Sequence, residues 1–261
     1  MADPTPPLIE LQSASVMRGD KIVLHDITLR IDVGEHVAIL GPNGCGKSTL
    51  VKTLTRECYP LARNGSRVRL FGREVWNVFE LRSLLGIVAN DFPAPTRQIS
   101  GREMVLSGFF SSVGLWSHQH VTADMEDRAG KALKQLEASH LSDRTYGEMS
   151  SGEARRILIA RALVHSPKAL LLDEPSTSLD LFAQHELRET MRRLARAGVA
   201  IILVTHQLSD IIPEIDRVVL IKSGRVMADG PKSELLAQGP IEKLFGVRLD
   251  LSERGGYIHA W

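Results

Sequence analysis

Apolar and polar residues alternate in the two-residue period of β-strands along the first part of the chain. In segment 22–31, Ile27, Leu29 and Ile31 alternate with polar residues, and segments 8–17 and 67–71 are also strand-like. Such alternation is typical of strands with one buried face. The pattern predicts an antiparallel β region at the start of the chain.

Continuous apolar runs appear later and predict buried parallel strands. They cover residues 36–40, 169–173 and 199–205, and helical patterns lie between them at 47–55, 151–163 and 182–197. Strands that alternate with helices indicate a parallel sheet of the α/β class. Segment 91–163 is predicted to be mostly helical, with one helix after Thr122, and segment 217–227 to be a hairpin that turns at Ser223 and Gly224.

This organisation predicts one domain over residues 1–261. Residues 1–90 and 165–238 form the β region and core, residues 91–164 form an inserted helical lobe, and residues 239–261 form a C-terminal extension. The helix at 151–163 is expected to be amphipathic and to begin after Ser150.

A glycine-rich loop joins the run 36–40 to the helix at 47–55. It consists of Gly41, Pro42, Asn43, Gly44, Cys45, Gly46, Lys47, Ser48 and Thr49. Glycines let a backbone curl around phosphates, a lysine reaches the β- and γ-phosphates, and the following hydroxyl binds Mg²⁺. The loop therefore predicts a nucleoside triphosphate site with Lys47 and Ser48 in these roles.

Two adjacent carboxylates, Asp173 and Glu174, end the apolar run 169–173. The carboxyl end of a parallel strand is where such sheets bind nucleotides. Asp173 is predicted to hold Mg²⁺, while strand alternation points Glu174 elsewhere, toward the water that attacks the phosphate.

Several further motifs resemble those of ABC-type ATPases over nearly the whole chain. Met149–Glu153, followed by Arg156 and segment 159–163, resembles the signature motif. Residues 178–180 resemble the D-loop, and His206 resembles the switch histidine. The resemblance implies a P-loop NTPase (RecA-like) core with an antiparallel β region and an inserted helical lobe.

The resemblance also implies a mechanism that needs two cassettes. Two modules meet head to tail around ATP and Mg²⁺, so that Ser150, Ser151 and Gly152 of one face the γ-phosphate held by the other. Glu174, His206 and Lys47 take the catalytic roles, and Asp180 communicates across the interface.

Four positions depart from the family pattern. Arg18 stands near the position where an aromatic residue usually stacks on adenine. Either its guanidinium stacks on the base instead or base selectivity is weak, so the preference for ATP over GTP is implied only by the resemblance. Asn90 replaces the usual metal-sensing glutamine and is shorter by one methylene, so a water bridge to Mg²⁺ is expected. Ser151 and Glu153 replace the commonest glycine and glutamine.

Composition narrows the class of protein. The net charge is +1, which gives no indication of nucleic-acid binding. No apolar run reaches the roughly 20 residues of a membrane span, so a cytoplasmic protein, at most peripheral to the membrane, is expected.

Cys45 and Cys58 are expected to be reduced, and Cys45 is interpreted as a small loop residue, with a redox role as the alternative.

Three functions remain open from the sequence. The first is an ATPase subunit that powers separate transmembrane transporter subunits, the second a solitary ATP-gated switch on a soluble macromolecule, and the third a nucleotide-binding scaffold without turnover. Segments 107–115 and 211–216, with Asn90, resemble a single-cassette, molybdate-transporter-like branch. Segment 107–116, rich in glycine, serine and aromatic residues, is either a partner surface or packing within the lobe.

Overall fold

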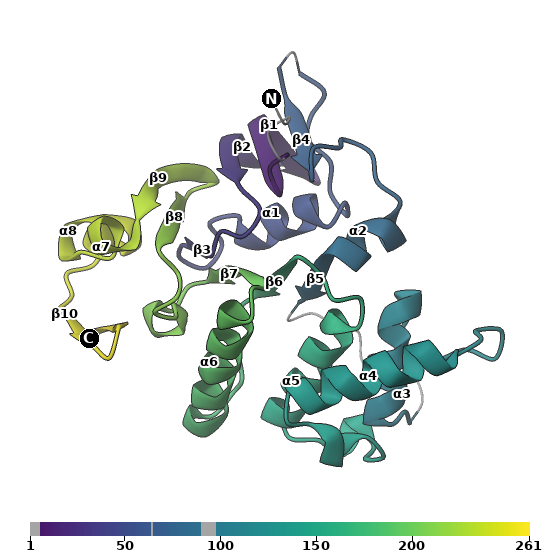
Figure 1. Ribbon diagram of the computed structural model, residues 1–261. Coiled ribbons are helices and arrows are strands. Elements are labelled where there is room, and N and C mark those ends of the chain that lie inside the picture. The colour runs from purple at the N-terminus through teal and green to yellow at the C-terminus, as the bar shows by residue number, and fades with distance from the viewer. Residues whose placement is uncertain (1–5, 64, 90–97) are drawn as a thin grey trace, which may run out of the picture. The chain divides into compact units, whose positions relative to one another are not determined.

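The structure is a computed structural model that describes residues 6–63, 65–89 and 98–261. It contains two compact units (Figure 1). The first unit comprises Met1–Trp76 and Ala200–Trp261, and the second comprises Asn77–Val199. The domain boundaries expected after residues 90, 164 and 238 stay a prediction.

The first unit begins with the predicted antiparallel sheet. Its strands are β1 (Ile9–Arg18), β2 (Lys21–Ile31) and β4 (Arg67–Leu70), in the order β2-β1-β4. Leu11 pairs with Leu29 on one side and with Val68 on the other, and all three are buried. The alternation in the sequence therefore marks the buried face of this sheet.

A second set of strands forms the core of the first unit. The order is β7 (Ala200–Thr205), β3 (Val37–Leu40), β8 (Arg217–Lys222) and β9 (Arg225–Pro231). β3 runs parallel to both β7 and β8, while β8 and β9 are antiparallel. Every residue of β3 and β7 is buried, which explains why their sequences are continuously apolar. Helix α1 (Lys47–Leu54) follows β3.

The C-terminal part of the first unit has more structure than the sequence predicted. The helices α7 (Lys232–Leu235) and α8 (Gln238–Phe245) precede a hairpin of β10 (Leu251–Arg254) and β11 (Tyr257–Ala260). Reciprocal backbone hydrogen bonds between Asp250 and Trp261 close the hairpin. These elements are too short to show a clear period in the sequence.

The second unit contains the helical segment and two strands. In chain order its elements are α2 (Val78–Leu84), β5 (Leu85–Val88), α3 (Gly101–Leu106), η1 (Ser107–Phe110), α4 (Ala123–Gln135), η2 (Ser139–Leu141), η3 (Tyr146–Glu148), α5 (Ser151–Leu163), β6 (Ala169–Asp173) and α6 (Leu181–Arg196). β5 and β6 are parallel. Figure 1 shows α3, α4 and α5 packed together, as predicted for a helical segment. Among the described residues, no helix is both long and apolar enough to cross a membrane.

The predicted amphipathic character of α5 is wrong, although its bounds are confirmed. Ile157, Leu158, Ile159 and Ala160 are buried in succession, which a helix with one apolar face does not allow. The helix packs against α3, α4, β5 and α6, so more than one of its faces is covered. The run of buried residues from Ile157 to Ala160 accordingly covers more than one side of the helix.

Candidate functional site

The glycine-rich loop lies between β3 and α1, as predicted. Gly44 and Gly46 have φ angles of +76° and +108°, in the left-handed region that glycine adopts without strain. A Cβ atom on Gly41 would lie 2.3 Å from the carbonyl oxygen of Ile221 and 2.7 Å from Sγ of Cys45. The backbone path of the loop thus requires glycine at these positions.

Lys47 lies across this loop. Its side chain is only 4% exposed, and Nζ donates hydrogen bonds to the carbonyl oxygens of Gly41, at 2.8 Å, and Pro42, at 3.1 Å. The backbone of α1 begins here, because the N–H of Leu50 donates to the carbonyl of Gly46. The N–H groups of Lys47, Ser48 and Thr49 precede that first helical bond, so they and the ammonium form an anion-binding face.

A glycine far along the chain supports the loop from behind. The N–H of Gly224, in the turn between β8 and β9, donates to the carbonyl of Cys45 at 2.8 Å, and its own carbonyl accepts from the N–H of His25 at 2.8 Å. A Cβ on Gly224 would lie 2.0 Å from the carbonyl oxygen of Val23. The sequence identified Gly224 only as a turn residue; contact with the loop carries no local signal.

His206 lies at the same edge of the strands as the loop. In the register, Leu40 at the end of β3 pairs with Thr205 at the end of β7, and the N–H of Gly41 donates to the carbonyl of Thr205 at 3.3 Å. The two segments that leave these strands therefore begin side by side. The structure brings together two features that lie more than 150 positions apart in the sequence.

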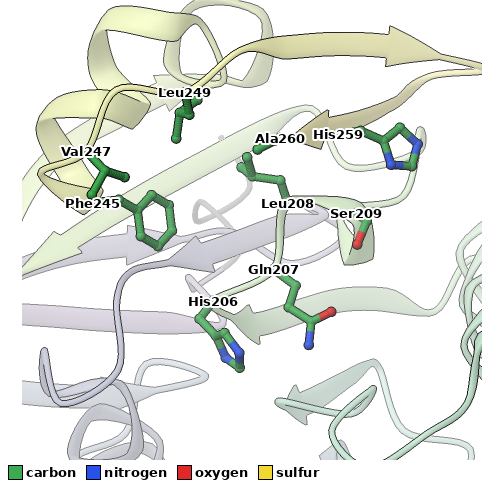
Figure 2. A pocket seen from close by; sticks show the side chains of 9 residues that line it. All are labelled: His206, Gln207, Leu208, Ser209, Phe245, Val247, Leu249, His259 and Ala260. Carbon is green, nitrogen blue, oxygen red and sulfur yellow. The ribbon is translucent and has the colours of Figure 1, made fainter.

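A cavity of about 390 Å³ borders the segment that carries His206. Figure 2 shows the lining residues, which come from two parts of the chain: His206, Gln207, Leu208, Ser209, Phe245, Val247, Leu249, His259 and Ala260. The C-terminal elements thus form one wall of a cavity next to the predicted switch histidine, and sequence reasoning missed this.

The second unit contains the predicted signature residues, at the start of α5. Ser150 Oγ accepts a hydrogen bond from the N–H of Glu153 at 3.3 Å, and the Glu153 carboxylate accepts one from the N–H of Ser150 at 2.8 Å. These reciprocal bonds form a capping box. The hydrogen bond from the Ser150 N–H is the largest cause that lowers the pKa of Glu153, and the charge of Arg144 also contributes. Glu153, predicted to be a tolerated variant, therefore orders the signature turn.

The signature turn lies beside the predicted D-loop in the same unit. Asp180 caps α6 by accepting a hydrogen bond from the N–H of Ala183 at 2.7 Å, and a Cβ on Gly152 would lie 2.8 Å from that of Ala183. Ser150, Gly152 and Asp180 are among the residues that line a small cavity of about 90 Å³ between α5 and α6. The close contact at Gly152 joins the two motifs.

Asp173 and Glu174 also belong to the second unit. Asp173 is the last residue of β6, whereas Glu174 has a φ angle of +45° and lies in the turn that follows. The sequence attributed the separate direction of Glu174 to strand alternation, and this reason is wrong. The left-handed backbone of Glu174 ends the strand, so the direction of its side chain is set by the turn and not by strand alternation.

The remaining predicted site residues are Arg18, Ser48 and Asn90. Arg18 is exposed at the end of β1, and Ser48 is exposed in the first turn of α1. Asn90 lies outside the described residues. Hydroxyl, carboxylate and amide oxygens are the donors that Mg²⁺ prefers, so the chemistry of Ser48 and Asp173 fits this ion. Cys45 is buried and Cys58 half-buried, and neither forms a disulfide among the described residues.

Comparison with known proteins identifies the family. The ABC transporter family model matches residues 24–177. The chain is 32% identical over 244 residues to the hemin import ATP-binding protein HmuV of Aliivibrio fischeri, covering 91% of this chain and 90% of the relative. It is also 32% identical over 248 residues to the uncharacterized ABC transporter ATP-binding protein YlmA of Bacillus subtilis, with coverage of 91% and 90%.

Solved structures of ABC transporter cassettes share the fold of this chain. The chain matches cbiO1 from Clostridium perfringens, part of the ABC transporter complex cbiONQ, with a TM-score of 0.74, 28% identity and coverage of 91% and 94%. The ADP conformation of MJ1267, an ATP-binding cassette of an ABC transporter, shares the fold with a TM-score of 0.78 at 24% identity, with coverage of 93% and 98%. The molybdate-transporter-like branch stays a prediction. The chain belongs to the ABC transporter ATP-binding family and is an ATPase cassette with a P-loop NTPase fold.

Proposed function

We propose that two copies of this chain bind two ATP molecules between them and that hydrolysis powers import through separate membrane subunits. The observation that carries this proposal is the loop at 41–49, where the Lys47 ammonium and the N–H groups of α1 form one anion-binding face beside His206. The signature turn in the second unit supplies the second surface that a paired cassette needs.

The side chains divide the chemistry between binding and hydrolysis. Lys47 and the loop N–H groups bind the β- and γ-phosphates, and Ser150 and Gly152 of the partner copy cover the γ-phosphate. Glu174 orients the attacking water, and His206 contacts that water or the γ-phosphate. Asp180 couples the presence or absence of ATP in one site to the other site of the pair.

A magnesium ion belongs to this proposal. Ser48 and Asp173 would hold it, with Asn90 through a bridging water, and when bound it neutralises charge on the phosphate oxygens. For the base of the nucleotide, exposed Arg18 offers a guanidinium plane that stacks on adenine.

The named relatives support the transporter function over a soluble switch. HmuV is an import protein by its name, and cbiO1 is part of a transporter complex. We place the chain at the cytoplasmic face of a membrane, held there by its membrane subunits. Glu174 and His206 are both present, which favours turnover over a nucleotide-binding scaffold.

The Glu174→Gln variant tests this function. It keeps the shape of the side chain and removes the charge that orients water, so hydrolysis should fall about 10²–10⁴-fold while ATP binding persists. Light scattering with saturating ATP and Mg²⁺ should then show a stable dimer. Glu234→Gln, at an exposed position on α7, is the matched control and should leave both turnover and oligomeric state unchanged. Only monomers in Glu174→Gln at saturating ATP would contradict the paired-site model.

A further inference from the structure

We infer that Thr205 and Asp210 are positioning residues that hold the backbone of His206 in the orientation needed for hydrolysis. The inference rests on the proposed role of His206 and names two residues that the family motifs did not identify. Each of these residues is only 1% exposed, so neither offers a surface that a bound nucleotide could contact.

One hydroxyl connects the two sides of His206. Thr205 Oγ1 donates a hydrogen bond to Asp210 Oδ2 at 2.9 Å and accepts one from the N–H of Gln207 at 3.0 Å. The first bond fixes the direction of the hydroxyl proton, so a lone pair is free to accept from Gln207. His206 therefore lies in a short turn that the Thr205 hydroxyl closes through its hydrogen bonds to Gln207 and Asp210.

Thr205 also connects this turn to the phosphate loop. Its carbonyl accepts the hydrogen bond from the N–H of Gly41, while its hydroxyl holds Gln207 and Asp210. Thr205 is the last residue of the buried strand β7, so its main chain is fixed by pairing with β3. The position of His206 relative to the loop is therefore determined by one well-anchored residue.

Asp210 is fixed from the other side. It ends the short helix η4 (Leu208–Asp210), and its N–H donates to the carbonyl of Gln207 at 3.3 Å. Strand β11 packs against η4, and Figure 2 shows Leu208 of this helix beside Ala260. A buried carboxylate is costly to desolvate, so an apolar residue would fill this position more cheaply if only packing were required.

The Thr205→Val variant removes the hydroxyl and keeps the shape. Loss of the bridge should lower kcat for ATP hydrolysis about 10- to 100-fold, because small displacements of catalytic groups have effects of this size. The Kd for ATP should change by less than about threefold, since the loop itself is intact. Thr205→Ser keeps the hydroxyl and should restore a rate close to that of the unchanged protein.

A matched control separates positioning from general stability. Thr55 Oγ1 also donates to a carboxylate, Glu57 Oε1 at 2.8 Å, at a buried position at the end of α1. Thr55→Val should therefore lower the melting temperature by about as much as Thr205→Val, roughly 2–4 °C, without lowering kcat. Equal loss of kcat in both variants would overturn the inference.

The His206→Ala background separates this inference from the proposed function. If Thr205 acts through His206, Thr205→Val should cause no further loss of kcat in that background. If His206→Ala hydrolyses ATP at the full rate, the role proposed for His206 fails. If His206→Ala is slow while Thr205→Val is as fast as the unchanged protein, the positioning inference alone fails.

Asp210→Asn provides a second variant in case Thr205→Val does not fold. The amide keeps the shape and an acceptor oxygen but removes the charge, and charge-assisted hydrogen bonds are roughly twice as strong as neutral ones. A smaller loss of kcat than in Thr205→Val, with unchanged ATP affinity, is expected. The inference would be overturned if the folded Asp210→Asn and Asp210→Ala proteins both hydrolysed ATP at the full rate.

Discussion

Gly224 illustrates how a single residue without any functional group supports the nucleotide loop. Its N–H donates a hydrogen bond to the carbonyl of Cys45, and its carbonyl accepts one from the N–H of His25. Its φ angle is +72°. The absence of a side chain lets the chain pass within contact of Val23. The loop at 41–49 is therefore shaped by its own glycines and also by the turn behind it.

Gly224→Ala should weaken ATP binding. The added Cβ would lie 2.0 Å from the carbonyl oxygen of Val23, so the turn must move and release Cys45. We expect the Kd for ATP to rise by about tenfold or more, with a stability loss of about 1–3 kcal/mol. Titration with a fluorescent ATP analogue and urea unfolding measure the two effects.

Gly34→Ala is the control for this prediction. Gly34 also has a positive φ angle, +91°, but a Cβ there would meet nothing within 4 Å. It should lose stability from backbone strain while ATP affinity stays the same. Equal affinity losses in the two variants would show that the contact with Val23 is not the cause.

At the scale of elements, two helices of the second unit begin in the same way. Ser150 with Glu153 caps α5, and Ser100 with Glu103 caps α3, each through a pair of reciprocal hydrogen bonds. The local physics of the two turns is the same, but only the first belongs to the signature motif. This pair allows the capping role of Ser150 to be separated from its proposed contact with ATP.

Ser150→Ala and Ser100→Ala should cost similar stability but differ in activity. Loss of an N-cap hydroxyl costs about 1 kcal/mol in either helix. Only Ser150→Ala should also lower the rate of ATP hydrolysis, because only Ser150 is proposed to contact the γ-phosphate of the partner's ATP. Urea unfolding and a steady-state ATPase assay distinguish the two effects; a full rate in Ser150→Ala would contradict the proposed contact.

At the scale of the whole molecule, the free energy of unfolding depends on pH through His165, a histidine of the second unit. The His165 ring lies 5.1 Å from the Phe109 ring, centroid to centroid, in an edge-to-face arrangement. Burial is the main cause that lowers the pKa of His165, and the charge of Arg128 adds to it. The unfolded chain therefore takes up this proton at a higher pH than the folded protein does.

This shift predicts that stability falls as the pH drops below the ordinary histidine pKa of about 6.5, because the unfolded state then binds more protons. His165→Gln removes the titrating group and should reduce the loss of unfolding free energy between pH 7.5 and pH 5. Urea unfolding at the two pH values measures it. His140→Gln, at an exposed position, should keep the pH dependence of the unchanged protein. An identical dependence in His165→Gln would contradict the prediction.

Much of the fold and of the site was predictable because the signals are local. The alternation at Ile27, Leu29 and Ile31 matches a buried face, and the bounds predicted for α5 and β6 are those observed. The loop at 41–49 was predictable because its glycines and Lys47 are close together in the sequence and contact one another within the same loop. The C-terminal hairpin was missed because its strands are only four residues long and owe their position to neighbours distant in the sequence.

The sequence by itself determined the class of the fold, the phosphate loop and the order of the family motifs, since each depends on residue types at short spacing. Only the tertiary structure decided what surrounds them: Gly224 behind the loop, Thr205 and Asp210 beside His206, and the left-handed turn at Glu174. These contacts join residues through strand pairing and chain reversal, and no local pattern encodes which distant segments will meet. For the same reason the burial of α5 on several faces became clear only when its neighbours were in place.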